Sequence, residues 1–585
     1  MANVNIKING KDYQVPEGIT VLEAARYAGI HIPTLCYLKD VNEIGACRMC
    51  VVEVKGAKGL VTACVYPVNE GMEITTTSPK IIQSRVKNLQ LLLSNHNREC
   101  LSCVRSGRCE LQDLCRKYDV REDSVYDGEK PYHTPDDSAV HMVRDNNKCI
   151  LCRRCTAVCA KVQGVGVIGP NERGFNSYIG SPFNMGLGET SCVACGQCIA
   201  VCPTGALYEK DYTADVFASL ADPNKHVVCQ VAPAVRAALG EEFDLPIGTE
   251  VEGKMASALR ALGFDKVFDT NFSADLTIME EATEFLERVQ NGGKLPLITS
   301  CSPGWIKYCE HYHPDMLDNL SSCKSPQQMF GAICKSYYAK NAGVDPKDIV
   351  MVSFMPCTAK KFEIQRDDQA GTGLPDVDYA LTTRELGRMI KRASIDFLEL
   401  EDGYFDDPLG KSTGAGVIFG ATGGVMEAAL RTAVEKLTGK ELESVDFMEV
   451  RGTEGIKEAT YNVAGMDINV CVASGLANAN KVLEMVKSGE KNYHFIEIMA
   501  CPGGCVNGGG QPRVHSDVRN FVDIRALRAK ALYDLDAKRE KRKSHENPDI
   551  ITLYDEFLGT PGSHKAHTLL HTSYEKRPMY TYGNK

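Results

Sequence analysis

A chain of 585 residues is too long for a single hydrophobic core, so several domains are expected. Its 43% hydrophobic and 24% charged residues exclude a disordered chain, and a formal net charge of -10 disfavours binding to nucleic acid or anionic membranes. The start lacks a basic region followed by an apolar one, and no apolar stretch is long enough to span a bilayer, so we expect a cytoplasmic protein. In that reducing compartment, 25 cysteines favour metal binding over disulfides.

Residues 1–78 are predicted to form a small β-grasp domain. Apolar and polar residues alternate over 4–15 around Asn9-Gly10, a dipeptide that favours a type I′ hairpin turn. Thr20 and Glu23 fit a capping box, and Gly29 can end the helix that follows. The loops after this helix carry four cysteines whose spacing suits a 2Fe-2S cluster or a structural zinc ion: Cys36, Cys47, Cys50 and Cys64. The β-grasp context favours the 2Fe-2S cluster.

Residues 79–118 are predicted to be helical before they break into a second cysteine-rich loop. This loop has one histidine and three cysteines, a set that can hold a 4Fe-4S cluster or zinc: His96, Cys100, Cys103 and Cys109. His96 can also be an ordinary helix residue, and Cys115 is expected to be a buried or free thiol. Residues 119–138 have no apolar period and are predicted to be a linker.

Residues 139–208 contain the pattern of a two-cluster ferredoxin, in which two runs of four cysteines each lend their last cysteine to the other run's cluster. One 4Fe-4S cluster is predicted on Cys149, Cys152, Cys155 and Cys202. The other is predicted on Cys192, Cys195, Cys198 and Cys159.

From residue 209 to residue 512 short apolar runs alternate with helical stretches, which predicts an α/β domain with buried strands. Cysteine motifs follow three of these runs, at the carboxyl ends of strands, where open α/β sheets place their sites. They contain Cys301, Cys357, Cys501 and Cys505. Glycines at 503, 504 and 508–510 are expected to let the backbone approach a bulky cofactor. Each cysteine taken alone could be a small buried hydrophobe.

Together these three motifs resemble those of the FeFe (iron-only) hydrogenases, and the order of the modules resembles the hydrogen-activating subunit of NADP-reducing or electron-bifurcating members. The resemblance implies an H-cluster, in which a 4Fe-4S cube on the four rear cysteines is linked to a two-iron unit with CO, cyanide and azadithiolate. The complete set would be one 2Fe-2S cluster, three further 4Fe-4S clusters and this H-cluster. Reversible H2 oxidation and proton reduction is the implied reaction.

The same resemblance implies roles for several other residues. Lys360 would donate to a cyanide, although an isolated lysine is commonly a surface residue. Other residues would line the cofactor pocket, and without the resemblance they would be core residues: Ala232, Pro233, Gln327, Met355, Phe419, Gly420 and Met499.

A proton route is also implied, with one departure from the family pattern. Where many members have two adjacent cysteines, this chain has Cys301-Ser302, so Cys301 is expected to bind the cube and Ser302 to carry protons. Glu281 and Glu284 share one face of a predicted helix, which could be a solvated face. The resemblance instead places them, with Ser321, on the proton route.

Residues 513–585 resemble a separate small subunit of some relatives and are expected to wrap the catalytic domain. His564, His567 and His571 in this tail are interpreted as a surface patch without a metal. Spacing of Gly414, Gly416 and Gly420 does not fit a dinucleotide fingerprint, so nicotinamide chemistry is expected on a partner. The expected partners are a flavin-containing NAD(P)H-binding subunit, small 2Fe-2S subunits and ferredoxin. A low-turnover hydrogen sensor and a non-catalytic electron-transfer subunit are the alternatives.

Overall fold

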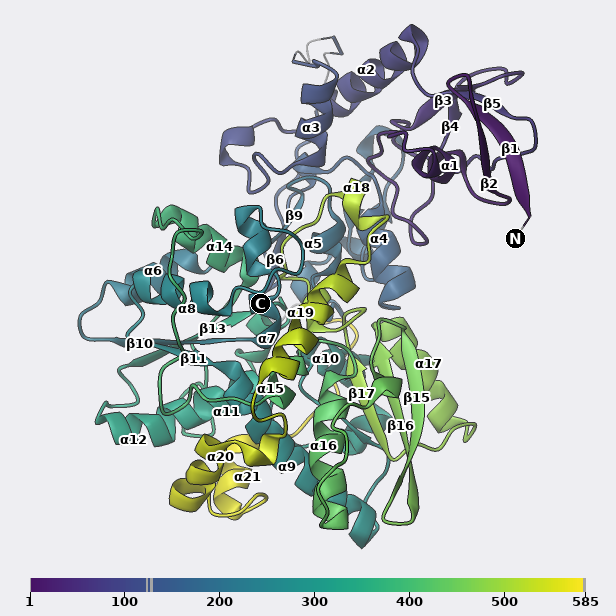
Figure 1. The fold of residues 1–585 in the computed structure, drawn as a ribbon. Coiled ribbons are helices and arrows are strands. Elements are labelled where there is room, and N and C mark those ends of the chain that lie inside the picture. Colours follow the sequence, from purple (N-terminus) through teal and green to yellow (C-terminus); the bar gives the residue numbers. More distant parts are fainter. Residues whose placement is uncertain (1, 122–124, 127–129, 582–585) are drawn as a thin grey trace.

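The computed structural model describes residues 2–121, 125–126 and 130–581. Figure 1 shows the five-stranded N-terminal sheet at one end, two four-stranded sheets at the other, and short elements of the ferredoxin-type part between them. None of the helices in these ranges is both long and apolar enough to cross a membrane.

The N-terminal part is a β-grasp sheet with the strand order β2-β1-β5-β3-β4. Its elements are β1 (Asn3–Ile8), β2 (Lys11–Pro16), α1 (Val21–Tyr27), β3 (Val51–Val54), β4 (Val61–Thr62) and β5 (Glu73–Thr75). The predicted hairpin is confirmed, with Asn9 at φ 49° and Gly10 at φ 83° in its turn. The capping box of Thr20 and Glu23 is also confirmed.

Helix α2 (Pro79–Ser94) follows, as the helical prediction for this region requires, and a second helix that was not predicted, α3 (Glu110–Lys117), comes after the cysteine-rich loop. The predicted linker includes 122–124 and 127–129, which lie outside the described residues. Among the described residues of 119–138, the only β-pairing is an isolated bridge between Asp136 and Arg144. A buried ion pair between Glu110 and Arg154, with 2.9 Å between Oε2 and Nη1, ties α3 to the ferredoxin-type part.

The ferredoxin-type part has little regular structure because its loops turn around the cysteine runs. Two antiparallel pairs form it, β6 (Met142–Arg144) with β9 (Leu207–Glu209) and β7 (Gly169–Asn171) with β8 (Tyr178–Gly180). Short helices α4 (Arg154–Ala157) and α5 (Gln197–Val201) each begin within a cysteine run.

The catalytic part contains two four-stranded sheets, which confirms the α/β prediction. The first is parallel, in the order β11-β10-β13-β14, and the second is mixed, in the order β12-β17-β16-β15. The strands are β10 (His226–Val231), β11 (Lys266–Asp269), β12 (Leu297–Ile298), β13 (Ile349–Met355), β14 (Tyr379–Thr382), β15 (Ile456–Val463), β16 (Met466–Ser474) and β17 (Phe495–Met499). The helices are α6 (Thr213–Leu220), α7 (Pro233–Arg236), α8 (Glu252–Ala261), α9 (Thr270–Asn291), α10 (Pro303–Tyr312), α11 (Pro326–Ile333), α12 (Ala339–Ala342), α13 (Lys360–Glu363), α14 (Thr383–Arg392), α15 (Gly414–Ile418), α16 (Gly424–Thr438) and α17 (Leu476–Lys487).

Helix α9 lies between the two sheets and contributes to the core of each (Figure 1). Phe272 and Leu276 pack in the cluster that includes Val228 of the first sheet. Ile278 and Phe285 pack in the cluster of the second sheet. Polar residues of α9 that lie between these apolar contacts are therefore buried as well.

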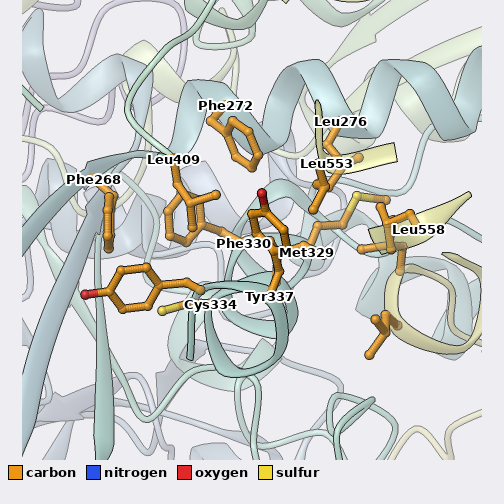
Figure 2. Close-up of a cluster of buried hydrophobic side chains, with 14 of the residues drawn as sticks. Phe268, Phe272, Leu276, Met329, Phe330, Cys334, Tyr337, Leu409, Leu553 and Leu558 are labelled. Atoms are coloured by element: carbon orange, nitrogen blue, oxygen red, sulfur yellow. The ribbon is translucent and has the colours of Figure 1, made fainter. Parts of the chain in front are cut away.

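The C-terminal segment completes the catalytic core. Its helices are α18 (Ser516–Arg519), α19 (Ile524–Lys538), α20 (Pro548–Leu553) and α21 (His564–Leu570). Leu553 and Leu558 point into the same cluster as Phe272 and Met329 (Figure 2). The segment was predicted to wrap the catalytic domain, and its leucines also form part of that domain's hydrophobic core. The exact domain borders stay a prediction.

Truncation of Leu553 should destabilise the protein, because its side chain is fully buried in this shared cluster. For Leu553→Ala we expect a loss of about 2–5 kcal/mol in the free energy of unfolding. Ile551→Ala is the matched control on the same helix, since Ile551 is 47% exposed, and it should cost far less. Thermal unfolding of both variants measures the difference, and equal midpoints would contradict the core contact.

Candidate functional site

The four N-terminal cysteines lie in one group next to the ferredoxin-type part. The sulfurs of Cys50 and Cys64 are 3.3 Å apart, and a hydrogen bond with Cys36 lowers the pKa of Cys47 to about 6. The Asn42 amide donates to the carbonyl oxygens of both Cys36 (2.8 Å) and Cys152 (3.0 Å). This side chain therefore joins the first cysteine group directly to the loop that carries the first ferredoxin run.

The second group contains a buried imidazole. Burial lowers the pKa of His96 to about 4, and its Nδ1 has no hydrogen-bond partner among the described residues. A neutral ring with an unpaired nitrogen fits a metal ligand. The charges of Cys109 and Cys100 add to burial in raising the pKa of Cys115 to about 11, so Cys115 is close to the ligand set as well.

The two ferredoxin runs form the crossed arrangement that their spacing predicts. One cavity is lined by Cys159, Cys192, Cys195 and Cys198, and a second by Cys149, Cys152, Cys155 and Cys202. Each cavity thus contains three cysteines of one run and the last cysteine of the other. The donor set and its burial fit one iron–sulfur cluster in each cavity.

The rear cysteines meet where three strands end. Cys301 follows β12, Cys357 follows β13, and Cys501 and Cys505 follow β17. Burial, the charge of Cys357 and the charge of Cys505 all raise the pKa of Cys501, so these thiols are close neighbours. All 25 cysteines are free thiols, which leaves the group available to a metal cluster.

Cys301 is also close to the carboxylates of α9. Burial raises its pKa, and among its charged neighbours Glu281 has the largest effect, ahead of Cys505. The hydroxyl of Ser302 instead accepts a hydrogen bond from the Ala500 amide at 3.2 Å. The thiol of Cys301 is therefore close to both Cys505 and Glu281.

The glycine run after Cys505 approaches protein backbone, and its approach to a cofactor stays a prediction. A Cβ on Gly508 would lie 2.2 Å from the Pro356 carbonyl oxygen, and one on Gly509 would lie 2.2 Å from that of Cys195. The Gln197 amide also donates to the Asn507 carbonyl oxygen at 2.8 Å. The last cysteine loop, the Cys357 loop and the second ferredoxin run are in direct contact as a result.

Lys360 is buried and points into the protein, so its interpretation as a surface lysine is wrong. Its ammonium donates to Ser325 Oγ (2.8 Å), Glu363 Oε2 (2.8 Å) and the Cys301 carbonyl oxygen (3.3 Å). An ammonium has three donors, so a further acceptor would replace one of these partners. The longest of the three, the contact with Cys301, is the natural one to be replaced.

The remaining predicted pocket residues are buried at the ends of strands and of helices. The Gln327 amide donates to Glu363 Oε2 (2.9 Å), and its carbonyl oxygen accepts from the Ser353 hydroxyl (2.8 Å). The other predicted lining residues are also buried: Ala232, Pro233, Met355, Phe419, Gly420 and Met499. Sequence reasoning missed Glu363, the shared acceptor of Lys360 and Gln327. Its position three residues after Lys360 was the available signal.

Glu281 and Glu284 lie on α9, and only Glu284 reaches solvent. Glu281 is 2% exposed, so a solvated helix face is wrong for it. The Ser321 hydroxyl donates to Glu284 Oε2 at 3.1 Å, and Arg288 pairs with the other carboxylate oxygen at 2.5 Å. Burial and then the charge of Glu284 raise the pKa of Glu281 to about 8, against a hydrogen bond from Ser321.

Comparison with known proteins places this geometry in a family. Residues 225–509 match the family model for the iron only hydrogenase large subunit, C-terminal domain, and residues 522–577 match that for the iron hydrogenase small subunit. Residues 1–79 match a 2Fe-2S iron-sulfur cluster binding domain, residues 85–124 the NADH-ubiquinone oxidoreductase-G iron-sulfur binding region, and residues 148–206 a 4Fe-4S dicluster domain.

Full-length relatives agree with these matches. The NADP-reducing hydrogenase subunit HndD of Solidesulfovibrio fructosivorans is 51% identical over 99% of this chain and 100% of its own length. Iron hydrogenase 1 of Clostridium pasteurianum is 45% identical over 98% of this chain and 100% of its own length. A solved structure of apo FeFe-hydrogenase HydA1 from Chlamydomonas reinhardtii, 45% identical, covers 63% of this chain and 100% of the HydA1 chain with a TM-score of 0.56. The chain belongs to the FeFe hydrogenase family.

The raised pKa of Glu281 gives a pH dependence that can be measured. The folded protein keeps the Glu281 proton up to about pH 8, whereas the unfolded chain releases it near the ordinary value of 4.5. Since the folded state binds the extra proton, the stability that Glu281 contributes falls as the pH rises through this window. Glu281→Gln replaces the titrating carboxyl group with an amide that does not titrate, so the variant lacks this loss of stability. The melting temperature of the variant relative to wild type should therefore rise between pH 5 and pH 8.

Glu287→Gln is the control for this measurement, because Glu287 is exposed on the same helix. Its effect on the free energy of unfolding should stay within about 0.5 kcal/mol. A difference between Glu281→Gln and wild type that does not change with pH would show that Glu281 is ionised in the folded protein.

Proposed function

We propose that this chain is the catalytic subunit of a hydrogenase that oxidises H2 and reduces protons reversibly. One observation carries the proposal: the rear cysteines adjoin both a ferredoxin-type cysteine group and a buried carboxylate. A Cβ on Gly509 would lie 2.2 Å from the Cys195 carbonyl oxygen, and burial and then the charge of Cys501 raise the pKa of Cys195. Burial and then the charge of Glu281 raise the pKa of Cys301. Electrons would therefore leave the pocket by way of Cys195 and protons by way of Glu281.

The cofactors would occupy the cysteine groups as their spacing predicts. A 2Fe-2S cluster would be held by Cys36, Cys47, Cys50 and Cys64, and 4Fe-4S clusters by the His96 group and by each ferredoxin cavity. The rear cysteines would hold the H-cluster, which supplies an open iron and a nearby base for splitting H2. Protein residues would position this cofactor, tune it with hydrogen bonds and exclude water.

The cysteine groups form a branched route for electrons. Asn42 joins the first group to Cys152, while a Cβ on Gly205 would lie 2.5 Å from the sulfur of Cys103 in the His96 group. Both N-terminal groups therefore adjoin the same ferredoxin cavity. The charge of Cys198 in the other cavity adds to burial in raising the pKa of Cys155, so the two cavities are close to each other. From there the route reaches the rear pocket through Cys195.

The route predicted for protons contains Ser302, Ser321, Glu284 and Glu281. A hydrogen bond joins Ser321 to Glu284, and Glu284 pairs with Arg288, whose side chain is 17% exposed. These contacts support an outer passage from Ser321 through Glu284 to the surface. The inner end is different, because the thiol of Cys301 is close to Glu281 and the hydroxyl of Ser302 accepts a hydrogen bond from the Ala500 amide.

Two arrangements of the inner end follow. In the first, Cys301 binds the cube and Ser302 passes protons. In the second, which the effect of Glu281 on the pKa of Cys301 favours, Cys301 passes protons. Ser302 then lies beside the cube, where its hydroxyl is a poor ligand compared with a thiolate. The two differ in whether loss of the Cys301 thiol removes the cube or only slows turnover.

The N-terminal groups would exchange electrons with partners. HndD is a subunit of an NADP-reducing hydrogenase by name, and a small-subunit-like region is present here at residues 522–577. We infer a flavin-containing NAD(P)H-binding subunit and small 2Fe-2S subunits as partners, with ferredoxin as a further one.

The proposed reaction is tested by infrared spectroscopy and viologen-linked H2 turnover of the holoprotein. We expect bands from CO and cyanide together with turnover. Cys501→Ala should remove both and leave the ferredoxin clusters visible by electron paramagnetic resonance, because Cys501 lies outside their cavities. Normal clusters without CO bands would instead support an electron-transfer subunit, and bands with very slow turnover a sensor.

The same spectra separate the two arrangements of Cys301. Cys301→Ala should lose the infrared bands if Cys301 binds the cube, and should keep them with slow turnover if it passes protons. Ser302→Ala should keep the bands with slow turnover if Cys301 binds the cube, and should lose the bands if Cys301 passes protons.

Glu284→Gln tests the outer part of the proton route. The amide keeps the shape of the side chain and can still accept the hydrogen bond from Ser321, but it cannot exchange a proton at neutral pH. We expect unchanged infrared bands and at least about a tenfold loss of H2 turnover, or roughly 1.4 kcal/mol on the limiting barrier. Glu287→Gln should keep full turnover. A normal rate for Glu284→Gln would show that protons leave elsewhere.

A further inference from the structure

The C-terminal segment places a histidine beside the outer carboxylate of α9. Cys323 and His571 are partners in an isolated antiparallel bridge. Backbone hydrogen bonds of 2.8 Å on either side, from Lys324 to Leu570 and from Thr572 to Ser322, hold the two segments in register. Partners in such a pair have neighbouring side chains on one face. The position of His571 next to Cys323 is therefore fixed by the backbone.

Three different donor atoms meet at this point. A carboxylate oxygen of Glu284, the sulfur of Cys323 and a ring nitrogen of His571 all lie within 4.8 Å of one another. The sulfur is 3.9 Å from Glu284 Oε2. Cys323 is fully buried, and the side chains of His571 and Glu284 are 5% and 14% exposed. The interpretation of the tail histidines as a surface patch is thus wrong for His571.

The histidine is also oriented as metal-binding histidines are. Its Nε2 is 3.0 Å from Glu280 Oε2, while Nδ1 is 2.8 Å from the Ser322 hydroxyl. Glu280 is buried and is held by hydrogen bonds from the Tyr554 hydroxyl and from the Gly562 amide (2.9 Å). A carboxylate on one ring nitrogen fixes the ring and makes the other nitrogen a better ligand.

We propose that Glu284, Cys323 and His571 form a binding site for a borderline-soft divalent cation of the Zn²⁺ type. One sulfur, one nitrogen and one oxygen are donors that zinc accepts, and water would complete four-coordination. Binding would release the Cys323 proton to solvent, because a thiolate is the ligand form. Glu280 adds negative charge nearby, and Arg288 is the cation that the metal would face across Glu284.

Occupation of this site would stop turnover, a consequence that rests on the proposed function. A carboxylate that is bound to a metal cannot accept and release protons as a free one does. Glu284 would then no longer receive protons from Ser321. The exposed ring of His567, stacked on His571 at 4.4 Å, lies beside the site but outside the donor set.

The experiment adds one equivalent of Zn²⁺ to the anaerobic holoprotein with all clusters loaded, followed by desalting and zinc K-edge absorption spectroscopy. We expect one sulfur at about 2.3 Å and nitrogen or oxygen neighbours at about 2.0–2.2 Å. Cys323→Ser should remove the sulfur neighbour, and His571→Gln should weaken zinc binding at least tenfold. His567→Gln is the matched control and should bind zinc as the wild type does.

Infrared spectra and iron content show whether each variant is assembled, and its turnover without zinc is its own reference. Zinc bound to sulfur alone, or bound equally well by the Cys323→Ser and His571→Gln variants, would overturn the site. Inhibition that a chelator reverses, and that His571→Gln escapes, would support both the site and its effect. Zinc with the expected neighbours but with undiminished turnover would uphold the site and overturn the proton route through Glu284.

Discussion

The close backbone contact of the last cysteine loop is the constraint on which the catalytic site depends. At Gly508 and Gly509 any side chain would collide with the carbonyl oxygens of Pro356 and Cys195. This contact brings together two loops of the rear pocket and one ferredoxin run, three segments that are distant in the sequence. Electron transfer into the pocket requires this proximity, and so does the exclusion of water from it. The cysteines can be grouped only because the glycines between and after them occupy so little space.

A second constraint concerns charge in the interior. Helix α9 packs on both sheets, so Glu281 has no solvated face and is only 2% exposed. Burial of an ionised carboxylate is costly, which is why the pKa of Glu281 is raised. Near the pocket, by contrast, Glu363 is paired with Lys360 and stays compensated. The same fold thus contains one buried carboxylate that can change its protonation near neutral pH and one that is held in an ion pair.

Features set by local sequence were predictable, and features set by long-range packing were not. The hairpin at Asn9-Gly10, the cap at Thr20 and the crossed ferredoxin runs each depend on residues a few positions apart or on a fixed spacing. The strand-end position of the rear cysteines followed from the order of apolar runs. In contrast, the burial of Glu281 depends on two sheets at once, and no local pattern records it. The neighbours of Cys301 and Ser302 depend on which way each side chain turns at the end of β12, and adjacent positions in the sequence do not specify that direction.

The C-terminal segment has a consequence for the order in which the protein is made. Leu553, Leu558 and Leu570 belong to the same buried cluster as Phe272 and Met329, which are synthesised more than two hundred residues earlier. The N-terminal modules can fold as they leave the ribosome, since domains generally fold as units during synthesis. The catalytic core cannot, because part of its interior is translated more than two hundred residues after Phe272 and Met329. Phe272 and Met329 therefore stay uncovered until the segment that contains Leu553, Leu558 and Leu570 has been synthesised.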